Sequence, residues 1–97
     1  MKYSFSSELW LWEGQGAWHF LTLPGDISAE IKEAFGTGRP GFGSIRVTAT
    51  IKGHVWKTSI FPDSKSGSYL LPVRAEIRKK AEISAGDQVE VNLDLEI

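Results

Sequence analysis

A chain of 97 residues has the length of one small domain, which can bury an apolar core without disulfides or metals. It contains no cysteine, which excludes disulfides, thiolate chemistry and cysteine-ligated zinc or iron–sulfur clusters. No signal peptide is visible, and no segment approaches the ~20 apolar residues of a membrane span. We therefore expect a single soluble domain over residues 1–97, located in the cytoplasm and without membrane contact.

The net charge of −1 conceals an uneven distribution along the chain. Residues 44–80 contain eight Lys or Arg against two acids, whereas the remainder contains three bases against ten acids. The interpretation that we favour is that both sets interleave over the folded surface and neutralise each other. The alternative is a basic face suited to phosphate or nucleic acid.

The first two predicted elements form an antiparallel hairpin. Residues 2–13 alternate as a strand, and residues 17–23 alternate as a second one. The turn between them contains Gly14 and Gly16, which both suit positive φ. The apolar face of the first strand is predicted to carry Tyr3, Phe5, Leu9 and Leu11, with Trp10 and Trp12 on its other, also covered, face.

A helix is predicted next, opened by Pro24-Gly25-Asp26 with Asp26 as the N-cap. Its apolar stripe consists of Ile27, Ile31, Ala34 and Phe35. Gly36 ends the helix, and residues 36–44 form a glycine-rich loop.

The second half begins with the alternating strand 44–52, which turns at Lys52-Gly53 into a strand that Pro62 ends. After a polar loop, residues 68–71 form a short strand, and Pro72 is predicted to open a second helix. The inward side chains of that helix are Val73, Ile77 and Ala81, and its outward ones are Arg74, Arg78, Lys79, Lys80 and Glu82. Residues 88–97 form the last strand.

The predicted order is therefore β-β-α-β-β-β-α-β, with a weak internal two-fold repeat. Leu23-Pro24 before one helix corresponds to Leu71-Pro72 before the other. Two such halves close naturally into a small barrel, because closure removes exposed strand edges. The predicted fold class is thus mostly β, a small closed barrel with two short helices.

Each candidate catalytic motif in the sequence lacks a feature that its chemistry requires. Gly36-x-Gly38-x-x-Gly41 has the spacing of a dinucleotide fingerprint, but it follows a helix and precedes a strand, the reverse of what that site requires. His19 and His54 lack a second ligand at metal-binding spacing, and Ser59 lacks a nucleophile elbow. We expect no enzyme, no cofactor and no metal.

Aromatic residues carry the remaining functional signal. The four tryptophans, Trp10, Trp12, Trp18 and Trp56, are predicted to lie in the core; the alternative is that some stack against a ligand beside arginines. Our first hypothesis is a non-enzymatic module that binds a ligand or protein partner, and the alternative is nucleic-acid binding through residues 44–80. The candidate binding residues are Arg39, Phe42, Arg46, Trp56, Lys57, Tyr69, Arg74 and Arg78.

Several blocks of this sequence together resemble a bacterial family. The blocks are Phe42–Ile45, Trp56–Pro62, Tyr69–Arg74 and Gly86-Asp87 before Val89-Glu90-Val91, and the family is domain of unknown function 1905. The resemblance implies a double-split β-barrel, related to swapped-hairpin transcription regulators that bind DNA as dimers. It implies no activity, and it leaves both a monomer and a homodimer open.

Overall fold

The computed structural model describes residues 1–14, 16–35 and 43–96. This part of the chain contains eight elements in the predicted order. They are β1 (Lys2–Leu11), β2 (His19–Thr22), α1 (Gly25–Phe35), β3 (Ile45–Ile51), β4 (His54–Pro62), β5 (Tyr69–Pro72), α2 (Ala75–Ala81) and β6 (Gln88–Leu95).

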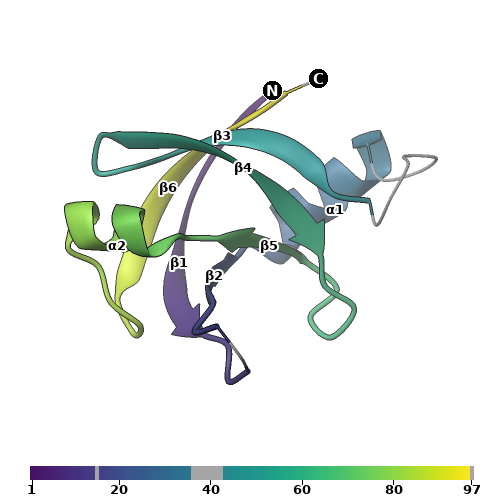
Figure 1. Ribbon diagram of the computed structural model, residues 1–97. Helices are drawn as coiled ribbons and strands as arrows, with labels where there is room; N and C mark the ends of the chain where they lie inside the picture. Colours follow the sequence, from purple (N-terminus) through teal and green to yellow (C-terminus); the bar gives the residue numbers. More distant parts are fainter. Residues whose placement is uncertain (15, 36–42, 97) are drawn as a thin grey trace.

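The six strands close into an antiparallel barrel in the order β1-β2-β5-β4-β3-β6, which confirms the predicted fold class. Figure 1 shows α1 and α2 on opposite sides of this barrel, and the two termini side by side. Every strand has two hydrogen-bonded neighbours, but two of the pairings are short: β1 meets β2 only over residues 9–11, and β4 meets β5 only over residues 61–62.

The pairing scheme has the two-fold symmetry that the sequence repeat predicts. Exchanging β1 with β4, β2 with β5 and β3 with β6 reproduces every pairing, and it also exchanges α1 with α2. The β2–β5 pair lies on this pseudo-axis, with Leu21 opposite Leu71. The β3–β6 pair lies on the other side, with Ala49 opposite Leu93.

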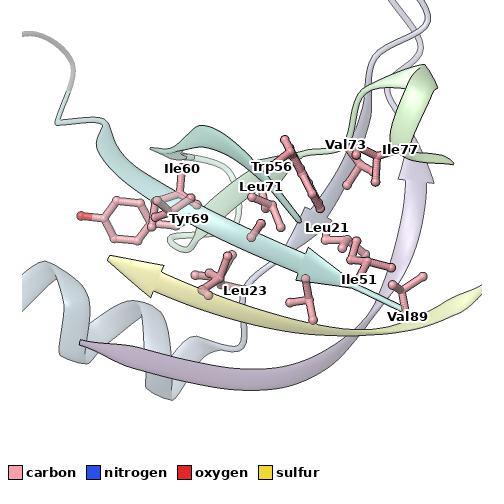
Figure 2. Packing of buried hydrophobic residues seen from close by; sticks show 14 of the residues in the cluster. Leu21, Leu23, Ile51, Trp56, Ile60, Tyr69, Leu71, Val73, Ile77 and Val89 are labelled. Atoms are coloured by element: carbon pink, nitrogen blue, oxygen red, sulfur yellow. The ribbon is translucent and has the colours of Figure 1, made fainter. Parts of the chain in front are cut away.

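The core fills the barrel with the inward side chains of each strand. Strict alternation places Val47 and Ala49 of β3, and Val91 and Leu93 of β6, inside, as predicted. Figure 2 shows Trp56 as part of the cluster of buried side chains. The largest side chains with essentially no exposed surface are Leu9, Leu21, Leu23, Ile31, Ile45, Val47, Ile51, Ile60, Leu71, Val91 and Leu93.

The predicted turn at Lys52-Gly53 is confirmed. Lys52 has a φ of 48° and Gly53 a φ of 79°, so both central residues occupy the left-handed region. A two-residue hairpin needs this conformation because its twist matches that of the flanking strands. Glycine adopts it readily, whereas lysine does so at a cost.

Both predicted helix starts are wrong by a few residues. The amide of Ser28 donates to the carbonyl of Pro24, so α1 begins at Gly25 and Asp26 lies within its first turn. Pro72 belongs to β5, because the amide of Val73 still donates to His19 across the sheet and keeps the chain extended. Helix α2 therefore begins only at Ala75.

The predicted apolar stripe of α1 is correct except at one position. Ile31 is fully buried, and Ile27 and Phe35 pack against the core, but Ala34 is exposed. The predicted end of this helix at Gly36 lies outside the described residues. Among the helices that the structure does describe, none is long and apolar enough to cross a membrane.

Candidate aromatic and cationic sites

Aromatic side chains gather around a hollow on the outer face of β1, β2, β5 and β4. The hollow has a volume of about 550 Å³. We call it the aromatic hollow; its lining residues are Trp10, Trp12, Trp18, Phe20, Phe61, Leu70 and, from the loop after β4, Asp63, Ser64 and Lys65.

Strand register explains why these side chains meet. Trp10 of β1 lies opposite Phe20 of β2, and Leu70 of β5 lies opposite Phe61 of β4. Their neighbours Leu9, Leu21 and Leu71 point inward, so alternation directs the aromatic set outward. Residues far apart in the sequence thus form one apolar surface.

Three of the rings are held in fixed mutual positions. The Trp10 and Phe20 ring centroids are 5.2 Å apart with the planes tilted by 41°. Trp18 and Phe20 lie nearly parallel, with centroids 6.0 Å apart and planes 10° from parallel. The indole N–H of Trp10 donates to the hydroxyl of Thr22 at 2.9 Å, which satisfies the polar atom of a half-buried ring.

The expectation that all four tryptophans lie in the core is wrong. Trp12 is 47% exposed and Trp18 is 51% exposed, while Trp56 is buried. Phe61 adds a third large exposed ring to the hollow, at 40%. Period-two alternation could not show which of these rings are exposed, because β1 carries large apolar side chains on both faces near its end.

The turn between β1 and β2 is shaped by two glycines for different reasons. Gly16 has a φ of 88°, as predicted, but Gly14 is not in the left-handed region. Gly14 is required because the Trp12 ring lies over it, and a Cβ there would be 2.2 Å from the ring carbons. The absence of a side chain at Gly14 therefore permits the position of Trp12.

Asp63 organises the loop that borders the aromatic hollow. Its carboxylate accepts hydrogen bonds from the Ser66 hydroxyl at 2.7 Å, and from the amides of Ser66 and Lys65. The bond from the Ser66 hydroxyl is the main reason that the pKa of Asp63 is held below its usual value of 3.8. An ionised Asp63 thus keeps the rim of the hollow in shape.

A second hollow, of about 370 Å³, adjoins the first. Trp18 lines both hollows. We call the second one the cationic hollow; its other lining residues are Gly16, Ala17, His19, Trp56, Thr58, Pro72, Val73, Arg74, Ala75 and Arg78.

Hydrogen bonds position the two arginines of the cationic hollow. Nε of Arg78 donates to the carbonyl of Val73 at 3.2 Å, and Nη1 lies 3.4 Å from Nε2 of His19. Nδ1 of His19 donates to the carbonyl of Ala17 at 2.9 Å, which leaves Nε2 as the acceptor toward Arg78. Nη2 of Arg74 donates to the carbonyl of Lys57 at 3.3 Å.

The ion pairs among the described residues do not include either of these arginines. Those pairs join Lys57 to Glu96, Lys80 to Glu76, and the N-terminal amine to Asp94. The lining of the cationic hollow includes no Asp or Glu. Its arginines thus have no carboxylate partner within the described part of the chain.

Of the predicted binding residues Trp56 and Tyr69, the structure places only Trp56 in the same hollow as Arg74. Trp56 is buried but lines the cationic hollow with Arg74 and Arg78. Tyr69 is also buried, and it lies opposite Pro62 at the far end of β4, six residues beyond Trp56, or about 20 Å along the strand. Figure 2 shows Tyr69 beside Ile60 at one end of the core, away from Trp56.

The other predicted site residues lie elsewhere. Arg46 and Lys57 are exposed on neighbouring strands β3 and β4, where Nζ of Lys57 is 3.4 Å from Oε1 of Glu96. Neither lines the two hollows. Arg39 and Phe42 fall outside the described residues. Sequence reasoning missed Phe20 and Phe61, although the alternation of Trp18 with Phe20 was a usable signal.

The fold and surface define a class of protein: a small closed antiparallel barrel with an aromatic and a cationic hollow side by side. A family model matches residues 5–93, nearly the whole chain. The chain belongs to this family, described as Domain of unknown function (DUF1905), which confirms the resemblance seen in the sequence. Among curated proteins, no match was found.

Proposed function

We propose that this chain is a non-catalytic binding module whose aromatic hollow takes a flat, apolar group of a ligand or partner. The observation that carries the proposal is the set of large exposed rings, Trp12, Trp18 and Phe61, around one hollow. Exposed apolar surface of this kind marks binding sites more often than scattered single residues do.

The size and chemistry of the hollow support this proposal. A volume of about 550 Å³ falls within the range of small-ligand sites, which are lined mostly by apolar and aromatic side chains with a few polar groups. Here the polar groups are Asp63, Ser64 and Lys65 on one rim. A flat ring would gain both apolar burial and stacking against Trp18.

A binding role is better supported than a catalytic one. The carboxylate of Asp63 is engaged by its own loop, and its pKa is lowered, so it is ionised and occupied at neutral pH. A general acid or base instead needs a pKa near the working pH. The hollow supplies a mostly aromatic surface with a few polar groups on one rim, which suits recognition.

Nucleic-acid binding by the entire segment 44–80 receives less support from the arrangement of its bases. Two of them, Lys57 and Lys80, are paired with carboxylates. Lys52 lies at the β3–β4 turn, whereas Arg74 and Arg78 line the cationic hollow. We therefore base the proposal on the aromatic hollow.

Two uncharged flat molecules, indole and adenosine, test the proposal. We expect both to shift the indole N–H resonances of Trp12 and Trp18, with dissociation constants of about 1 mM, as small fragments give. Trp18→Ala should weaken binding on the order of fivefold or more, because one stacking partner is lost.

Val55→Ala is the matched control, since Val55 is 61% exposed but lies outside both hollows. It should leave both dissociation constants unchanged. Absence of any shift with indole and adenosine up to about ten times the expected dissociation constant would overturn the proposed function.

A further inference from the structure

The two hollows meet at one side chain, Trp18, which lines both of them. We propose that together they form a single site for a nucleotide, with the base in the aromatic hollow and the phosphate against Arg74 and Arg78. This inference rests on the proposed function and adds to it the chemical class of the ligand.

The two arginines on the anion side of the site have more N–H donors than their hydrogen bonds to the protein use. A guanidinium carries five N–H donors, and Arg78 commits two of its nitrogens, to Val73 and His19, while Arg74 commits one to Lys57. The remaining N–H groups suit the forked hydrogen bonding that arginine forms with phosphate oxygens.

Charge complementarity selects an anion for this hollow. Its lining contains two arginines and no acid, and no ion pair of the described residues involves either arginine. Arg78 is half-buried and lines the same hollow as the buried Trp56, so its charge is less screened than that of a surface lysine. A phosphate would supply the partner that the described chain does not provide.

The base side offers a stacking platform. Trp18 lies nearly parallel to Phe20 and is 51% exposed. Stacking on such rings accepts every base, since each has a flat π-face. In a nucleotide, one sugar links a flat base to an anionic phosphate. The two hollows match this arrangement, because one is aromatic, the other is cationic, and they share one indole ring.

A free mononucleotide and a nucleotide within a single strand present this same chemistry. Binding is therefore compared for adenosine, adenosine 5′-monophosphate and an oligodeoxyadenylate of about eight nucleotides, a length typical of single-strand sites. We expect the monophosphate to bind on the order of tenfold more tightly than adenosine at low salt, because charge-assisted hydrogen bonds are added.

Arg74→Gln and Arg78→Gln should abolish most of this gain while leaving adenosine binding unchanged. Arg74 is exposed, so Arg74→Gln keeps the test valid even if Arg78→Gln, which removes the bond to Val73, impairs folding. Arg46→Gln is the control: it removes an exposed arginine outside both hollows and should preserve the gain.

The outcomes separate the two proposals. A monophosphate that binds no better than adenosine, or a gain that survives Arg74→Gln, overturns the nucleotide inference and leaves the binding module intact. If none of these three probes binds, the nucleotide inference is overturned, and the proposed function is overturned with it when indole also fails to bind. An oligonucleotide that binds more tightly than the monophosphate, with affinity falling steeply with salt, supports the inference with a single strand as the source. Equal affinity supports it with a free nucleotide as the source.

Discussion

The indole ring of Trp12 lies over the backbone of Gly14, and a Cβ at Gly14 would come within 2.2 Å of the ring. The ring must therefore move in Gly14→Ala. Because Trp12 is 47% exposed, we expect this displacement to change the free energy of unfolding by less than about 1 kcal/mol. The indole N–H resonance of Trp12 should shift, and indole binding should weaken.

Gly25→Ala provides the control for that substitution. No atom lies within 4 Å of a Cβ built at Gly25, which begins α1. This variant should leave the Trp12 resonance and indole binding unchanged. An unaltered Trp12 resonance in Gly14→Ala would contradict the steric explanation.

The rim of the aromatic hollow should be sensitive to acid through Asp63. The pKa of Asp63 is lowered in the folded protein, so its contribution to stability is complete above the unfolded value of 3.8 and disappears as the pH falls through the lower folded value. The Ser66 amide resonance should titrate with the Asp63 carboxyl group. Ser66→Ala should move the pKa of Asp63 back toward 3.8; an unchanged pKa would show that the Ser66 hydroxyl is not the cause.

Leu21 and Val55 should differ sharply in their contribution to stability. Leu21 is fully buried at the β2–β5 pseudo-axis, whereas Val55 is 61% exposed. Leu21→Ala should lower the free energy of unfolding by about 2–5 kcal/mol, since it removes buried carbon and leaves a cavity. Val55→Ala should change it by about 0.5 kcal/mol or less. Urea denaturation measures both, and similar values would contradict the assigned burial.

The hairpin turn offers a route to a more stable protein. Lys52 holds a φ of 48°, a conformation that asparagine tolerates better than lysine. Lys52→Asn should therefore raise the free energy of unfolding by about 0.5–1 kcal/mol, and it creates the Asn-Gly pair preferred in such turns. Lys65→Asn, at a lysine without positive φ, should have no such effect. Equal thermal midpoints for Lys52→Asn and the unaltered chain would argue against the strain.

The order of the elements was predictable because local patterns encode it. Alternation in β3 and β6 identified buried residues such as Val47 and Leu93, and the Lys52-Gly53 turn followed from residue type. The helix starts were less accurate, because Pro72 was judged from local preference alone. Its place in β5 depends on the pairing of Val73 with His19, a contact between distant segments.

The candidate site was predictable only in part. Arg74 and Arg78 were identified, and Trp56 does line the hollow with them. Tyr69 was predicted to belong to the same site, although β4 and β5 put it at the other end of the core. The exposed Trp12 and Trp18 were expected inside, because alternation distinguishes two faces of a strand without saying which one is outer.

The sequence by itself therefore determined the element order, the alternating core and the family, since each depends on neighbours along the chain. Only the tertiary structure decided that Trp12, Trp18 and Phe61 share one outer surface, and that Trp18 also lines the hollow that contains Arg78. The physical reason is barrel closure: the order β1-β2-β5-β4 brings together strands from both halves of the chain, and no local pattern records that order.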